Sequence, residues 1–252
     1  MKNNPVQEKE KLISQEDTYY LALSIKVRKN EKKYLKHHMK EQLKQALSLW
    51  AANRSIQDIA IYHHGKTAEK EGDFTLWDYL ILIQLKDKEN AAQIAADIKK
   101  VKLPSMPETV RMELLVTTPK STYPNPGKKA LKRKSKPFYA VEYVDVKEPY
   151  LKEFQTIMIQ NNGPAMSYIM EEAKWCYNFY ALETVSVFYH NKNYPTWNQV
   201  HVIGLFLESM LFYKKDFSKG LMLANQISFE DNMARLKQIR TMLLKSVGRK
   251  LE

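Results

Sequence analysis

An α+β fold made of two tandem ferredoxin-like units with antiparallel sheets is predicted by three features of the sequence. Segments with strand-like alternation and segments with helical spacing follow one another in the order β-α-β-β-α-β through residues 19–118. The second half, residues 137–252, begins in the same order. A Pro-containing stretch rich in Lys and Arg, residues 119–136, separates them and is interpreted as a basic linker. Residues 1–18 are expected to form an N-terminal tail.

The elements of the first unit follow from the spacing of their apolar residues. Leu21, Leu23 and Ile25 alternate with smaller or polar residues, which indicates a half-buried strand. Apolar residues three and four positions apart indicate helices. The predicted order is strand 19–27, helix 31–53, strand 57–64, strand 76–85, helix 88–100 and strand 109–117.

The second unit repeats the beginning of this order but ends differently. Its predicted elements are strand 138–146, helix 148–159, a further helical segment from Pro164 to about residue 175, and strands 184–190 and 197–206. Ser228 to Asp231 resembles a capping box, and Met233, Leu236, Ile239, Leu243 and Val247 follow it at helical spacing. No fourth strand is apparent, so this unit is expected to end in an extra C-terminal helix.

Composition places the chain among ordinary globular proteins. Apolar residues make up 44% and charged residues 27% of the 252 residues. The N-terminus has no apolar signal region, and no apolar run approaches the roughly 18 residues that would span a bilayer. The one cysteine, Cys176, excludes an internal disulfide framework. A cytoplasmic protein is the resulting expectation.

The positive charge is unevenly distributed. Lys and Arg exceed Asp and Glu by 12, and residues 119–136 contain basic residues but no acidic one. Such an excess favours polyanionic partners. The stretch is interpreted first as an interdomain linker and second as a surface that binds nucleic acid.

The element order and the alternating sheet faces of residues 19–206 resemble the dimeric α+β barrel superfamily, which includes the antibiotic-biosynthesis monooxygenase-like, EthD-like and NIPSNAP-like families. The resemblance rests on element order and not on a diagnostic motif. It implies a barrel closed either between two chains, hence a homodimer, or between tandem halves of one chain. It also implies a pocket used for small organic ligands, for haem-related chemistry or for no known reaction.

Strand register gives a candidate site in the second unit. If Leu21, Leu23 and Ile25 pack on helices, alignment of the two halves places Val141, Tyr143, Val200 and Val202 on the same face. The opposite, barrel-facing set is Glu142, Ser186, Phe188, His190, Trp197, Gln199 and His201. Glu142 beside His201 could orient the imidazole for acid–base catalysis, and the remaining five residues are candidate ligand contacts. The competing interpretation is a satisfied polar network with a purely structural role.

Other motifs are absent from the sequence. Neighbouring histidines, His37-His38 and His63-His64, would point in different directions on a helix or a strand, so no metal site is expected. Phosphate-binding glycine loops and a nucleophile elbow are missing. The strand Leu76 to Leu85 has aliphatic residues where the stacking rings of an RNA-recognition motif would be expected, and no Arg-Gly pair flanks it.

These observations lead to one main hypothesis for function and two alternatives. The main one is a small-molecule-binding α+β barrel protein; whether it is an enzyme is left open, and if it is one, cofactor-independent chemistry on an aromatic or polyketide-like compound is the most compatible. That chemistry is implied by the resemblance alone. The alternatives are a nucleic-acid-binding module that uses the Lys-rich linker and a structural dimerisation protein without catalysis.

Overall fold

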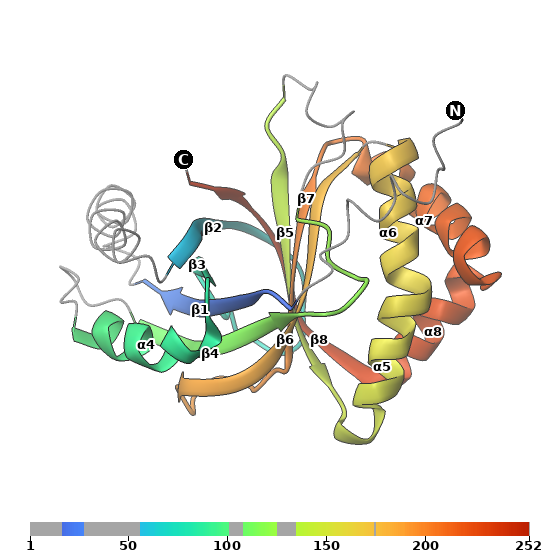
Figure 1. The fold of residues 1–252 in the computed structure, drawn as a ribbon. Coiled ribbons are helices and arrows are strands. Elements are labelled where there is room, and N and C mark those ends of the chain that lie inside the picture. The colour runs from blue at the N-terminus through green and yellow to red at the C-terminus, as the bar shows by residue number, and fades with distance from the viewer. Residues whose placement is uncertain (1–16, 28–55, 101–107, 125–134, 174, 252) are drawn as a thin grey trace, which may run out of the picture.

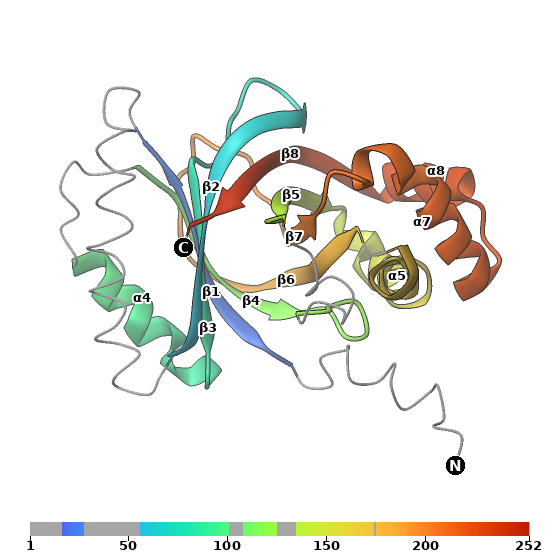
Figure 2. The ribbon, with the colours of Figure 1, turned by 90° about the horizontal axis from the view of Figure 1, so that it is seen from above.

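The computed structural model describes residues 17–27, 56–100, 108–124, 135–173 and 175–251. Their strands form one antiparallel sheet that closes into an eight-stranded barrel, with helices on its outside (Figure 1). Seen from above, α4 lies on one side of the barrel and α5 to α8 lie together on the opposite side (Figure 2). Helix 31–53, predicted for the first half, lies outside the described residues.

Each half contributes four strands to the barrel, and most of the described helices belong to the second half. The first half contains β1 (Tyr19–Lys26), β2 (Ile56–Lys70), β3 (Tyr79–Leu85), a 3-10 turn (Lys88–Asn90), α4 (Ala91–Lys100) and β4 (Glu108–Thr117). The second begins with β5 (Phe138–Val146), a 3-10 turn (Glu148–Tyr150), α5 (Leu151–Ile157) and α6 (Gly163–Tyr168). It continues with β6 (Cys176–His190), β7 (Gln199–Leu205), α7 (Ser209–Asn225), α8 (Phe229–Ile239) and β8 (Arg240–Lys250).

The strand order is the same in both halves. Around the barrel the order is β1-β3-β2-β8-β5-β7-β6-β4. The first half therefore runs β4-β1-β3-β2 and the second β8-β5-β7-β6. The barrel closes within one chain, because β2 pairs with β8 and β4 pairs with β6.

The expectation of a long C-terminal helix is wrong in its second part. Ser228 caps α8 as predicted, with its Oγ accepting a hydrogen bond from the backbone N–H of Asp231 at 3.0 Å. The helix ends at Ile239, and the chain continues as β8 between β5 and β2. Pairing on both edges satisfies the backbone of this strand, and this long-range gain outweighs the local helical spacing.

The gap between the two helical segments predicted at 148–159 and from Pro164 onward is also helical. A π-helical turn, Met158–Asn162, joins α5 to α6, and a second one, Ile169–Ala173, follows α6. Pro164, the second residue of α6, follows directly on the first π-helical turn, where the regular i to i−4 hydrogen-bond pattern is already interrupted.

The predicted inner and outer faces of the strands hold in the first half but not in the second. Leu21, Leu23 and Ile25 pack against α4 outside the barrel, as predicted. Val141, Tyr143, Val200 and Val202, expected on the helix-covered face, instead fill the barrel interior. Since β5 is buried on both faces, hydrophobic alternation cannot show which face is the inner one.

The beginning of the predicted linker belongs to the packed body. Ser121, Thr122 and Tyr123 are buried, and Tyr123 forms a bridge with Phe179 of β6. Residues 125–134, which carry most of the linker's basic residues, lie outside the described residues.

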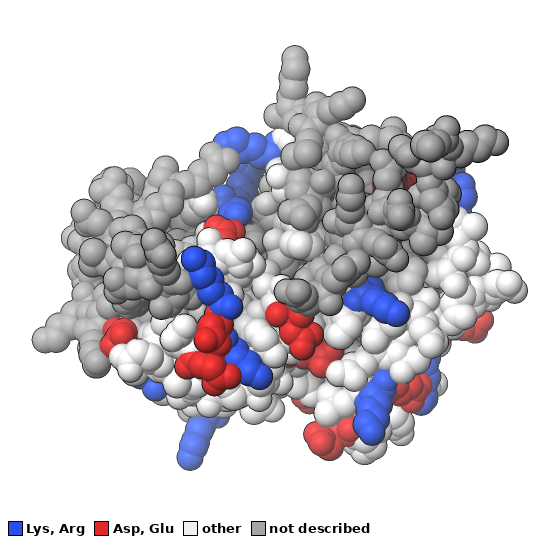
Figure 3. All heavy atoms as spheres, in the orientation of Figure 1, with Lys and Arg blue, Asp and Glu red and all other residues white. Residues whose placement is uncertain are grey.

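The described part of the chain has no excess of either charge. Eighteen of the 40 Lys and Arg and six of the 28 Asp and Glu fall outside it, which leaves 22 of each sign. Acidic and basic side chains are interspersed on the face seen in Figure 3. The excess of +12 is therefore carried by the segments outside the described residues. None of the described helices combines the length and apolar character needed to cross a membrane.

Candidate functional site: a cavity between the second half of the barrel and its helices

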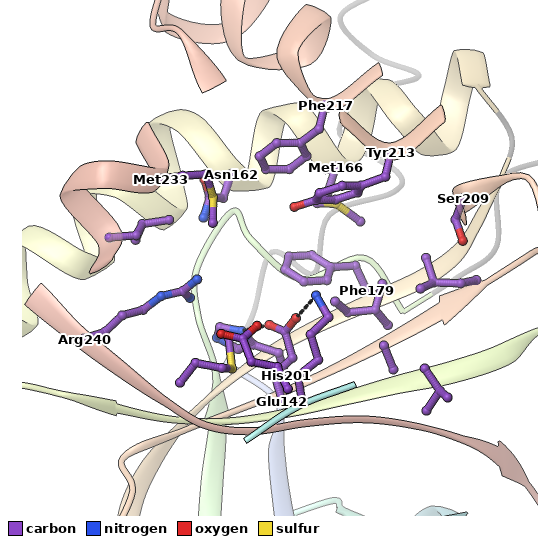
Figure 4. Close-up of a pocket in the computed structure, with 18 of the residues that line it drawn as sticks. Glu142, Asn162, Met166, Phe179, His201, Ser209, Tyr213, Phe217, Met233 and Arg240 are labelled. Atoms are coloured by element: carbon purple, nitrogen blue, oxygen red, sulfur yellow. Dashed lines mark hydrogen bonds and ion pairs between the residues drawn. The ribbon is translucent and has the colours of Figure 1, made fainter. Parts of the chain in front are cut away.

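A cavity of about 660 Å³ lies between the outer face of the second half of the sheet and the helices that cover it (Figure 4). Glu142 and His201 lie on its sheet side. Lys245 from β8 lies beside Glu142 on the same sheet and also lines the cavity. Met166 and Phe217 face them from the helices. The volume is in the range typical of sites for small organic ligands.

Three charged or polar side chains form a row across the floor of the cavity. Glu142 on β5 is the direct cross-strand neighbour of His201 on β7 and of Lys245 on β8. Lys245 Nζ donates to Glu142 Oε1 at 2.8 Å, and His201 Nδ1 lies 3.3 Å from Glu142 Oε2. In the neutral ring, a proton on Nδ1 leaves Nε2 as an acceptor. That Nε2 atom is buried and has no partner among the described residues.

The row keeps Glu142 charged. Burial acts to raise the pKa of its carboxyl, but Lys245, His201 and Arg240 outweigh this and hold the pKa well below its usual range. Glu142 in turn raises the pKa of Lys245 above its ordinary value, against the opposing effect of burial. Glu142 and Lys245 are therefore an ion pair at neutral pH.

A second cation, Arg240, lies at the start of β8 and lines the cavity. Its guanidinium carbon is 5.9 Å from the centre of the Phe154 ring. Burial lowers the pKa of Arg240, partly offset by Glu142. Among the described residues, no carboxylate oxygen comes within 4.0 Å of this guanidinium. Arg240 thus presents a charge to the cavity without a direct counter-ion.

The helical cover is held by a network of asparagines. Asn161 donates to Asn232 at 3.0 Å, Asn232 to Asn162 at 2.9 Å, and Asn225 to Asn161 at 2.8 Å. Asn161 and Asn162 lie in the first π-helical turn, and such turns are frequent at functional sites. The network ties this turn to α7 and α8 above the floor of the cavity.

The structure brings together two of the predicted site residues, Glu142 and His201, but on the helix-covered face instead of inside the barrel. Gln199 is buried on the same strand two residues before His201, and its Oε1 has no partner among the described residues. It does not line the cavity.

The other predicted ligand contacts lie elsewhere. Trp197 is inside the barrel, where its Nε1 donates to Glu113 at 2.7 Å. The His190 ring lies 6.0 Å from Trp197. Phe188 packs against the core of the first half, and Ser186 is exposed. The expected convergence of all seven residues on one surface is therefore wrong. The pairing of β6 with β4 contains register shifts, and Trp197 lies before β7 begins, so simple alternation does not hold for these residues.

Lys245 and Arg240 were missed because the segment that carries them was expected to be helical. The alternation of Leu244, Ser246 and Gly248 with Lys245 and Val247 is the signal that could have revealed a strand there.

Metal and haem binding can be tested against the residues present. No group of three His, Cys, Asp or Glu side chains within the described ranges could hold a metal ion. The haem-related chemistry implied by the barrel resemblance needs an axial ligand that reaches the iron. His201 is the histidine in the cavity wall, and its free Nε2 is buried. The arrangement does not fit a histidine-ligated haem, and no step is derived through one.

Comparison with known proteins shows similarity at the level of the fold. No protein-family model and no curated protein matches the sequence. A mutant chlorite dismutase from Candidatus Nitrospira defluvii in complex with cyanide covers 97% of this chain and 95% of its own, at 10% identity and a TM-score of 0.52. The enzyme from the same organism in complex with imidazole gives the same coverage, 10% identity and a TM-score of 0.51. Together with the strand order, these likenesses show that the chain has an α+β barrel fold of the kind found in chlorite dismutase.

Proposed function

We propose that the protein binds a small organic molecule in the cavity between β5, β7, β8 and helices α5 to α8. The observation that carries this proposal is a cavity of about 660 Å³ with apolar walls and a few charged groups placed on one side. Such a combination lets a ligand bury apolar surface while the polar groups fix its orientation.

The walls favour a ligand with a flat or extended apolar body. Phe179, Phe217 and Trp175 supply aromatic surface, while Met158 and Met166 supply side chains that adapt to irregular shapes. An aromatic or polyketide-like compound suits these walls. The similarity to chlorite dismutase is a likeness of fold, so it does not extend the proposal to that enzyme's reaction.

Proton transfer by Glu142 and His201 is the second candidate. It is favoured by the hydrogen bond that holds Nδ1 of His201 to a charged carboxylate, which leaves Nε2 to accept a proton. Glu142 would be a positioning residue, since both of its oxygens already have partners. Nε2 of His201 is buried in the protein without ligand, so a substrate does not have direct access to it. Ligand binding is therefore better supported than catalysis.

The proposal also includes the division into two tandem units and the assembly of two chains. The repeated strand order supports two tandem ferredoxin-like units. Because the barrel closes within one chain, assembly into a homodimer would use its outer surfaces.

Binding of nucleic acid by the Lys-rich stretch 119–136 stays a prediction. It would show as affinity for a random oligonucleotide that falls steeply with salt.

The cavity is tested by filling it. Ile203 lines the cavity and is partly buried, so Ile203→Phe should reduce its volume. Ile98→Phe is the matched control, because Ile98 is a partly buried isoleucine packed on the core of the first half. A thermal-shift screen of aromatic and acyl compounds should give ligands whose stabilisation is lost in I203F and kept in I98F. Stabilisation retained in I203F would place the binding site elsewhere.

The proton-transfer role needs a separate readout. A ligand that donates to His201 should change the ring ¹⁵N chemical shift of Nε2 in the bound protein. In the Glu142→Gln variant the ligand should still bind, but the shift of the Nε2 signal that it causes should differ in size from that in the unmodified protein. An unchanged Nε2 signal in the complex would exclude the role.

A further inference from the structure

We propose that the ligand of this cavity is an amphipathic monocarboxylic acid, whose carboxylate is bound by Arg240 and whose apolar body lies between the sheet and α6 to α8. This inference rests on the proposed ligand-binding function and names the chemical class of its ligand.

The first step is the balance of buried charge. Among the charged residues that line the cavity, Glu69, Glu71 and Lys237 are exposed at its edge, where solvent screens their charges. Deeper in the cavity lie one buried carboxylate, Glu142, and two half-buried cations, Lys245 and Arg240. Since Glu142 and Lys245 pair at 2.8 Å, the positive charge of Arg240 is left over.

The second step is the cost of that unpaired charge. A charge partly removed from water without a partner is unfavourable, and the site gains most from a ligand group that neutralises it. One negative charge on the ligand is enough to neutralise the guanidinium of Arg240. A doubly charged group would leave an excess of negative charge close to Glu142, so a monoanion is favoured over a dianion.

The third step is geometry. A guanidinium presents two parallel N–H donors to a planar carboxylate, a match that a single ammonium group does not offer. Arg240 projects into the space between Met233 of α8 and the Glu142–His201 floor (Figure 4). The guanidinium lies over the ring of Phe154, within the distance of a cation–π contact.

The fourth step concerns the rest of the ligand. Beyond Arg240 the cavity is lined mainly by apolar side chains, among them Met166, Phe179, Ile203 and Phe217. These surfaces provide no further charge for a second ionic group. A fused-ring or acyl-chain body attached to one carboxylate satisfies both ends of the site.

The experiment compares acids with neutral analogues of the same shape. Calorimetry of the full-length protein with 2-naphthoate and 2-naphthamide, and with decanoate and decanamide, should show at least one acid binding about tenfold or more tighter than its amide. Arg240→Gln should abolish that preference and leave amide binding nearly unchanged. Arg249→Gln is the control, because Arg249 is an exposed arginine on the same strand that does not line the cavity.

Two further outcomes separate this inference from the proposed function. If acid and amide bind equally and both are lost in I203F, the carboxylate proposal is overturned while the pocket stands. If I203F binds every probe as the unmodified protein does, both proposals fail.

Should R240Q not fold, Arg240→Lys keeps the charge and removes the paired donors. In that variant a partial loss of acid preference is expected, and an undiminished preference would contradict the role of the guanidinium.

Discussion

Glu142 on β5 and Lys245 on β8 are directly paired residues whose side chains meet 2.8 Å apart, between Oε1 and Nζ, on the floor of the cavity. The two residues come from opposite ends of the second half, and only the insertion of β8 beside β5 brings them together. The strand that completes the barrel therefore also supplies the counter-ion of the carboxylate.

Replacing Glu142 with Gln should lower the free energy of unfolding by about 1–3 kcal/mol at neutral pH, because a charged hydrogen-bonded group loses its partner while Lys245 remains partly open to solvent. The folded-state pKa of Glu142 is lowered, so its contribution is fully present above the ordinary carboxyl pKa of about 4.3 and is lost as pH falls toward the folded value. Urea unfolding of both proteins across this range measures the difference, which should shrink on acidification.

The control for this prediction is Glu230→Gln. Glu230 forms an exposed ion pair with Lys214 at 2.8 Å, and solvent screening should leave the unfolding midpoint nearly unchanged. A loss in E230Q equal to that in E142Q would show that burial of the Glu142–Lys245 pair has no special effect.

Glu113 holds together the polar group inside the barrel. It accepts hydrogen bonds from Trp197 at 2.7 Å and Thr184 at 2.8 Å, and it pairs with buried Arg111 at 2.9 Å. Glu113→Gln leaves the guanidinium without a charged partner and should cost about 3–5 kcal/mol. Glu108→Gln, at an exposed carboxylate on the same strand, is the control. Equal stability of E113Q and E108Q in chemical denaturation would contradict the prediction.

Gly220 of α7 packs directly against Ala165 of α6. A Cβ built on Gly220 would lie 2.8 Å from the Cα of Ala165, which is backbone and cannot turn aside. Gly220→Ala should therefore destabilise the protein by about 1–3 kcal/mol. Helix propensity alone would stabilise it by about 1 kcal/mol, so the sign of the change in thermal unfolding decides between the two. Lys219→Ala, at the exposed neighbour, should show no comparable loss.

Most of the sheet could be predicted from the sequence because its strands carry regular alternation. β5 was predicted with its observed limits, and the outward packing of Leu21, Leu23 and Ile25 is confirmed. The proximity of Glu142 and His201 also followed, since aligned strands place them opposite each other whichever face they occupy.

The sequence could not show which face of β5 and β7 points into the barrel, nor that the chain ends in the strand β8, and both failures have physical reasons. β5 and β7 are buried on both sides, so their hydrophobic pattern does not distinguish barrel from helix cover. Met233 to Val247 satisfies a helical period locally, and only pairing with β2 and β5 makes its second part a strand. Arg240 and Lys245 depended on that pairing, which arises from contacts distant in sequence.

Cys176 should be unreactive in the folded protein. Its thiol is fully buried at the start of β6, donates to the backbone oxygen of Asn178 at 3.4 Å, and has its pKa raised by burial. Because the thiolate is the reactive form, its reaction with a disulfide reagent near pH 8 should be at least about 100-fold slower than in denaturant. Ser186→Cys places a thiol at an exposed position of the same strand and provides the reference rate. Folded Cys176 reacting as fast as that introduced thiol would show that β6 opens readily at its junction with the cavity.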